Sequence, residues 1–163
     1  LEPLSELKDV VEHFSTNHTR VIFTMGKGGV GKTSVAAAIA VGLTEKGHNV
    51  HLTTTDPAAH LDHMFQNSAI SQGLTVSSIN PEVEVEKYKK QVINVAGDLS
   101  EEELTYLKED LASPCTEEIA VFRTFADVVE GSEQEIVVID TAPTGHTLLL
   151  LDSSEAYHKE MSR

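Results

Sequence analysis

The eight residues from Gly26 to Thr33 constrain the fold of this chain more than any other segment. They read Gly-Lys-Gly-Gly-Val-Gly-Lys-Thr and complete the pattern G-x-x-x-x-G-K-[ST]. In this pattern backbone N–H groups turn toward phosphates, the lysine reaches the β- and γ-phosphates, and the last hydroxyl can bind Mg²⁺. Residues 21–24 predict a strand before the loop, and residues 34–46 predict a helix after it. The sequence therefore predicts a nucleoside triphosphate site, and the alternative is a glycine-rich turn with an incidental lysine.

The predicted nucleotide-binding residues form one continuous segment. They are Gly26, Lys27, Gly28, Gly29, Val30, Gly31, Lys32, Thr33 and Ser34.

Lys27 stands directly after the first glycine, at a position that an ordinary phosphate-binding loop leaves open. The loop thereby resembles that of the signature-lysine class of P-loop ATPases, in which two ATPase units face each other. In that class the lysine reaches the nucleotide of the opposite unit and stabilises charge on the γ-phosphate, as an arginine finger does. The resemblance implies a catalytic role for Lys27 beside Lys32. The alternative for Lys27 is a solvated surface lysine.

The charge balance excludes several classes of partner. Twelve lysines and arginines stand against 26 aspartates and glutamates, which gives a net charge of −14. Such a chain repels nucleic acid and anionic lipid. No apolar run approaches the roughly 20 residues that a membrane-spanning helix needs, and the single cysteine, Cys115, excludes an internal disulfide. We expect a cytoplasmic protein that does not bind nucleic acid.

The flanking patterns predict an α/β domain. Residues 4–14 carry apolar side chains at helical spacing, which predicts an introductory helix. Gly47 is placed to end the helix that follows the loop. Residues 50–54 are rich in β-branched side chains, which predicts a second strand. The continuous apolar run of residues 136–139 is typical of a central parallel strand buried on both faces.

The middle of the chain predicts further elements. We expect a short strand over residues 74–79, a helix over residues 83–95, and another helix opened by the acidic residues 101–103. Together these elements predict a three-layer P-loop domain with a mostly parallel sheet. We expect residues 1–163 to form a single, C-terminally truncated domain of this kind, with residues 1–19 as introductory helix and linker.

Two aspartates follow predicted strands. Asp140 comes directly after four apolar residues, the arrangement in which a carboxylate binds Mg²⁺ directly or through water; the alternative is a capping aspartate. Asp56 precedes Pro57, which favours an extended or turn conformation at the end of the second strand. Asp56 is the best candidate to activate water, although a lone aspartate at a strand end more often forms an Asx turn.

Two strings make the resemblance specific. Residues 55–60 read Thr-Asp-Pro-Ala-Ala-His, and residues 140–147 read Asp-Thr-Ala-Pro-Thr-Gly-His-Thr. With the loop, they resemble the switch I, switch II and P-loop of the arsenical pump-driving ATPases (ArsA) and of the related Get-pathway ATPases, over about residues 21–151. The resemblance implies that Asp56 activates water, that Asp140 binds Mg²⁺ with Thr33 and Asp56, and that residues 145–151 relay the nucleotide state.

Residues 113–122, Ser-Pro-Cys-Thr-Glu-Glu-Ile-Ala-Val-Phe, resemble the arsenite branch rather than the targeting branch. Ser113 as N-cap and Pro114 at the first helical position would place Cys115 in the first turn of a helix, where N–H groups favour a thiolate. As(III) and Sb(III) are thiophilic. The family pattern implies Ser113, Cys115 and His146 as metalloid ligands. The alternatives are a small buried hydrophobe for Cys115 and a hydrogen-bonded polar residue for His146.

The resemblance also implies partners. One cysteine cannot saturate a three-coordinate metalloid, so a homologous ATPase half or a second subunit is expected, and this chain resembles the second half of a tandem duplication. The family further implies ATP, Mg²⁺ and As(III) or Sb(III) as ligands. It implies a membrane arsenite channel as a partner and allows a metallochaperone as a further one. Two other functions remain open: a targeting factor for tail-anchored membrane proteins and a partitioning ATPase, which the charge of −14 disfavours.

Overall fold

The computed structural model describes residues 6–26, 30–55, 72–132 and 134–141. The chain divides into two compact units, which are described separately. The first comprises the described parts of Leu1–Ile79 and Ala126–Ala142, and the second those of Asn80–Phe125 and Pro143–Arg163. No helix among the described residues has the length and apolarity that crossing a membrane requires.

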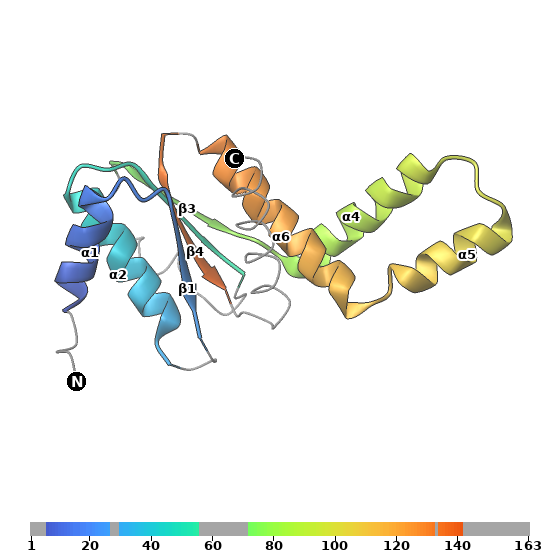
Figure 1. Cartoon of the computed structure of the whole chain (residues 1–163), viewed down its shortest axis with the longest axis horizontal. Helices are drawn as coiled ribbons and strands as arrows, with labels where there is room; N and C mark the ends of the chain where they lie inside the picture. The colour runs from blue at the N-terminus through green and yellow to red at the C-terminus, as the bar shows by residue number, and fades with distance from the viewer. Residues whose placement is uncertain (1–5, 27–29, 56–71, 133, 142–163) are drawn as a thin grey trace, which may run out of the picture. The chain divides into compact units, whose positions relative to one another are not determined.

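The first unit contains a parallel sheet of four strands. They are β1 (Val21–Met25), β2 (Val50–Thr54), β3 (Leu74–Ser78) and β4 (Ile136–Thr141), in the spatial order β1-β4-β2-β3 (Figure 1). Every residue of β4 is buried, as its continuous apolar run predicts for a central strand. All four predicted strands are therefore confirmed. The last of them extends two residues further than expected and includes Asp140 and Thr141.

Helix α2 (Lys32–Glu45) packs on the sheet through small side chains. Its residues Ala36 and Ala40 are fully buried, and alanine lets a helix backbone approach a sheet closely. The helix begins at Lys32, two residues before the predicted start at Ser34, so the loop lysine belongs to its first turn. The buried core between α2 and the sheet also contains Ile22, Ile39, Leu43, Val50, Leu52, Ile136 and Val138.

The end of α2 confirms the predicted glycine cap. Gly47 has φ +90, a left-handed conformation that side chains rarely adopt. Its N–H donates to the Thr44 carbonyl at 2.9 Å, and the His48 N–H donates to the Leu43 carbonyl at 3.2 Å. These two bonds form a Schellman motif. The motif turns the chain directly into β2.

Helix α1 (Leu7–Thr16) confirms the introductory helix, although Leu4, where it was predicted to begin, lies outside the described residues. Val11 of α1 is buried against α2, where a Cβ added to Gly42 would lie 3.1 Å from both Val11 methyl groups. Glu12 forms an ion pair with Lys46 just after α2. Glycine at position 42 therefore permits close approach of the two helices.

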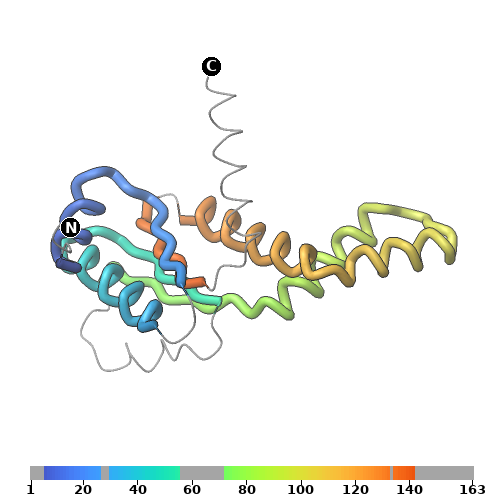
Figure 2. The backbone as a smooth tube through the Cα atoms, turned by 60° about the horizontal axis from the view of Figure 1, so that its bottom comes forward, coloured from blue at the N-terminus to red at the C-terminus, as the bar shows by residue number. Residues whose placement is uncertain are grey.

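The second unit contains α4 (Pro81–Ala96), α5 (Glu101–Asp110) and most of α6 (Pro114–Gly131), whose last turns belong to the first unit. Helices α5 and α6 begin where the sequence predicts, whereas α4 begins at Pro81, two residues before the predicted start at Val83. The Asn80 side chain accepts from the N–H groups of Glu82 and Val83, and Ser100 and Glu103 form a capping box. Figure 2 traces the chain from α4 through α5 into α6, which returns beside α4.

Candidate functional site

The phosphate-binding loop connects β1 to α2. Lys27, Gly28 and Gly29 lie outside the described residues. Gly31 has φ +82 and occupies the N-cap of α2, where its carbonyl accepts from the Val35 N–H at 3.0 Å. A side chain at this position would strain the backbone. The glycine therefore allows the chain to pass from the loop into a helix whose free N–H groups point toward the loop.

The side chains at the end of the loop and the start of α2 divide into two groups. Those of Lys32 and Thr33 are partly buried, and both reach Asp140. Val30 and Ser34, which were predicted as nucleotide-binding residues together with the rest of the loop, are exposed. Gly26 ends the described part of the chain before the gap at residues 27–29, immediately after β1. The described ends of the loop therefore lead from the carboxyl end of β1 to Lys32 and Thr33.

Asp140 is fully buried, and within the described residues four side chains donate hydrogen bonds to its carboxylate. Lys32 Nζ lies 3.3 Å from Oδ1, and Thr33 Oγ1 lies 2.7 Å from Oδ2. Thr24 Oγ1 donates to Oδ1 at 3.2 Å, and Thr54 Oγ1 donates to Oδ2 at 3.3 Å. A buried carboxylate is stable only when it is paired and hydrogen-bonded in this way. The structure thus brings Lys32, Thr33 and Asp140 together.

This donor set fits a magnesium ion. The Thr33 hydroxyl can donate its proton to Asp140 while its oxygen lone pairs remain free for a metal. Carboxylate and hydroxyl oxygens are hard ligands of the kind that Mg²⁺ takes. Lys32 beside them supplies a cation at the start of a helix, where phosphates bind. The site can therefore hold a polyphosphate together with its metal ion.

Asp56 and His146 lie outside the described residues, so their predicted roles stay predictions. The described chain does reach Thr55, which directly precedes Asp56. The Thr55 N–H donates to the Asp140 carbonyl at 3.1 Å, and its hydroxyl donates to the Thr141 hydroxyl at 3.2 Å. The backbone before Asp56 is therefore tied to the strand that carries Asp140.

Cys115 is exposed in the first turn of α6, which begins at Pro114 as predicted. The alternative of a small buried hydrophobe is therefore wrong for this cysteine. Ser113, which directly precedes the helix, is also exposed. In the described part of the chain, no group of three or more histidine, cysteine, aspartate or glutamate side chains is arranged to hold a metal ion.

Sequence reasoning missed Thr24 and Thr54. Both are buried, Thr24 one residue before the end of β1 and Thr54 at the end of β2, at core-facing positions where an apolar residue would be expected. That departure from the apolar pattern is a signal that could have identified them. Their hydroxyls, with Lys32 and Thr33, complete the set of donors to Asp140.

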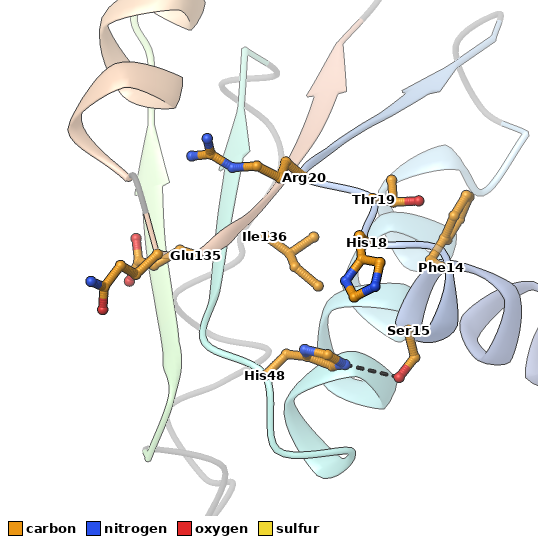
Figure 3. Close-up of a pocket in the computed structure, with 9 residues that line it drawn as sticks. Phe14, Ser15, His18, Thr19, Arg20, His48, Glu135 and Ile136 are labelled. Atoms are coloured by element: carbon orange, nitrogen blue, oxygen red, sulfur yellow. Dashed lines mark hydrogen bonds between the residues drawn. The ribbon is translucent and has the colours of Figure 1, made fainter.

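A pocket of about 310 Å³ lies at the opposite, amino-terminal edge of the sheet. It is lined by the end of α1 and by residues near the starts of β1, β2 and β4, among them His18, Arg20 and His48 (Figure 3). The hydroxyl of Ser15 is 2.8 Å from His48 Nε2. No predicted site residue lines this pocket, and parallel α/β sheets bind ligands at the carboxyl ends of their strands. It is therefore separate from the nucleotide site.

Comparison with known proteins identifies relatives along almost the whole chain. An arsenical pump-driving ATPase from Escherichia coli is 53% identical over 158 residues, which are 96% of this chain and 27% of that protein. One from Acidiphilium multivorum is 51% identical over 158 residues, again 96% and 27%. The ATPase GET3C of Arabidopsis thaliana is 33% identical over 194 residues, with 98% of this chain and 49% of that protein covered.

The chain spans about a quarter of the length of the first two relatives. The model of the family described as anion-transporting ATPase matches residues 19–163, so only α1 and the residues around it precede the match. Strand, loop, helix and buried carboxylate all fall within the matched range. The chain belongs to the anion-transporting ATPase family.

Proposed function

We propose that this chain is part of a Mg²⁺-dependent ATP hydrolase. The observation that carries the proposal is the contact of the buried Asp140 carboxylate with Lys32 and Thr33 of the phosphate-binding loop. Family membership and relatives named arsenical pump-driving ATPases support it. We further propose that residues 1–163 are part of a single P-loop domain, with residues 1–19 as introductory helix and linker.

The residues take distinct roles in this proposal. Lys32 leaves Asp140 and neutralises the β- and γ-phosphates, and the backbone N–H groups of residues 26–34 bind the phosphate oxygens. Thr33 and Asp140 hold Mg²⁺, which when bound neutralises charge on the phosphates. Asp56 activates the attacking water and joins the metal site, and Lys27 acts on the nucleotide of a facing unit. The last two roles rest on the sequence resemblance.

We also propose that arsenite or antimonite stimulates the hydrolysis, with Ser113, Cys115 and His146 as metalloid ligands. The exposed position of Cys115 in the first turn of α6 supports this, because its sulfur is accessible and As(III) and Sb(III) are thiophilic. A single cysteine needs further ligands from a homologous half or second subunit, and we propose that this chain is the second half. Hydrolysis then energises metalloid efflux through a membrane channel, with the ATPase on the cytoplasmic side.

A targeting factor for tail-anchored membrane proteins is the alternative that the sequence leaves open. The relatives named arsenical pump-driving ATPases are 53% and 51% identical to this chain, against 33% for GET3C of Arabidopsis thaliana. The higher identity, together with Cys115, favours the arsenical branch.

The first experiment tests nucleotide binding. Lys32→Ala in the complete protein should abolish Mg²⁺-dependent ATP binding at this site, since it removes the cation for the phosphates. Lys87→Ala is the matched control, because the Lys87 side chain is 63% exposed on α4. Equilibrium binding of a fluorescent ATP analogue reports the result. Undiminished binding in Lys32→Ala would refute the assignment.

The second experiment tests the metalloid. Cys115→Ser replaces a soft ligand with a hard one of similar size, so arsenite stimulation should need far more metalloid while basal hydrolysis persists. His146→Ala, which keeps the thiolate, should weaken stimulation less. Hydrolysis rates against arsenite concentration, with thiol reductant held constant, distinguish these outcomes. A wild-type activation curve for Cys115→Ser would favour the targeting alternative.

A further inference from the structure

Three polar residues form a row across the carboxyl ends of neighbouring strands. The strand register pairs Asp140 with Thr24 of β1 on one side and with Thr54 of β2 on the other. The three strands lie side by side in Figure 1, with β4 in the middle. Thr24 is 9% exposed, and Asp140 and Thr54 are fully buried. The row therefore lies at the carboxyl end of the buried apolar part of the sheet, next to the first turn of α2.

The four donors to Asp140 divide evenly between this row and the loop. Oδ1 accepts from Thr24 of the row and from Lys32 of the loop, and Oδ2 accepts from Thr54 of the row and from Thr33 of the loop. Each carboxylate oxygen thus has one donor that belongs to the nucleotide site and one that belongs to the sheet. The sheet donors belong to strands β1 and β2, and Thr24 Oγ1 also lies 3.4 Å from the Ile139 carbonyl oxygen.

The division has a consequence when a nucleotide binds. Lys32 cannot neutralise the phosphates and at the same time keep its full ion pair with Asp140. Nucleotide binding therefore weakens the pairing of a fully buried carboxylate. Such a charge is costly unless other donors remain. Thr33 can keep donating while its oxygen faces a metal ion. The other remaining donors are the hydroxyls of the two strand threonines, whose β-branched side chains have few rotamers.

We propose that Thr24 and Thr54 are positioning residues that stabilise and orient the Asp140 carboxylate while Lys32 moves between Asp140 and the phosphates. This inference rests on the proposed function. It adds residues outside the loop and the two switch strings to the machinery of the site. The two hydroxyls act through Asp140 and do not touch the nucleotide.

A double-mutant cycle tests the proposal by binding rather than activity. Thr24→Val and Thr54→Val remove the hydroxyls at nearly constant shape, and each is made in the complete protein with Asp140 present and in an Asp140→Asn background. The probe is a fluorescent, non-hydrolysable ATP analogue with Mg²⁺. With Asp140 present, each valine variant should bind about tenfold more weakly, because a hydrogen bond to a charged group is lost. In the Asp140→Asn background the loss should be less than about threefold.

Serine variants separate the hydroxyl from packing. Thr24→Ser and Thr54→Ser keep the donor and should bind within about twofold of wild type. Where a valine variant does not fold, the alanine variant at the same position completes the cycle. Equal losses in both backgrounds, or serine variants as weak as valine ones, would overturn the positioning role. Failure of the proposed function would look different: Lys32→Ala would bind the analogue as well as wild type.

Discussion

Asp140→Asn is the perturbation that most directly tests the arrangement of the site. It keeps the shape of the side chain and removes its charge. In the structure Lys32 Nζ lies 3.3 Å from the carboxylate, and the two side chains are 9% and 0% exposed. At an effective dielectric constant of about 20, the Coulomb attraction at this distance is roughly 5 kcal/mol. Desolvation offsets most of it, which leaves about 1.5–3 kcal/mol for a hydrogen bond to a charged group.

This energy opposes nucleotide binding in the absence of metal, because Lys32 has to leave Asp140 and the phosphates approach a carboxylate. Asp140→Asn removes both costs. We therefore expect the affinity for ATP in EDTA to rise about tenfold or more. In the wild type Mg²⁺ should tighten binding strongly, whereas in Asp140→Asn it should have little effect, because the metal has lost its carboxylate.

Titration of a fluorescent ATP analogue in EDTA and in Mg²⁺ measures both affinities. Asp127→Asn is the matched control, since Asp127 is exposed on α6 and should leave both values unchanged. The reasoning fails if Asp140→Asn retains the wild-type response to Mg²⁺. It also fails if the variant weakens binding in EDTA as strongly as Lys32→Ala does.

Two further predictions concern the docking of α1. Gly42→Ala should destabilise the protein by about 1 kcal/mol despite the better helix propensity of alanine, because the new methyl group meets both methyls of Val11 at 3.1 Å. In a Val11→Ala background the same change should stabilise the protein. Chemical denaturation measures both effects. Lys46 donates a hydrogen bond to Glu12 and attracts its charge, which lowers the Glu12 pKa below its ordinary value of 4.5. The resulting stabilisation is present above pH 4.5 and is lost as the pH falls through the folded value, so the melting temperatures of wild type and Glu12→Gln should differ at pH 7 and converge near pH 3. Melting curves whose difference persists at pH 3 would contradict the ion pair.

The sequence predicts most of the first unit because its signals are local. The β-branched run before the loop, the alanine-rich helix and the glycine at position 47 each specify an element by their own conformational preference. Asp140 could be predicted as a site residue because a charge after four apolar residues has few structural explanations.

The sequence could not show which side chains donate hydrogen bonds to the Asp140 carboxylate. Thr24 and Thr54 are far from Asp140 in the chain, and only the register of the sheet places them opposite it. The start of α2 was misplaced by two residues because the loop pattern hides the helical character of Lys32 and Thr33. Cys115 could be placed in a first helical turn from Ser113 and Pro114, since capping is also a local signal.

The strand order has a consequence for biosynthesis. β4 inserts between β1 and β2, and Thr24 and Asp140 are separated by 116 positions. During translation β1 and β2 therefore leave the ribosome long before their common neighbour is made, and each exposes an unpaired edge in the meantime. Contacts of such long range form slowly, and open strand edges invite aggregation. A nascent chain that stalls before residue 136 would therefore be a client for chaperones.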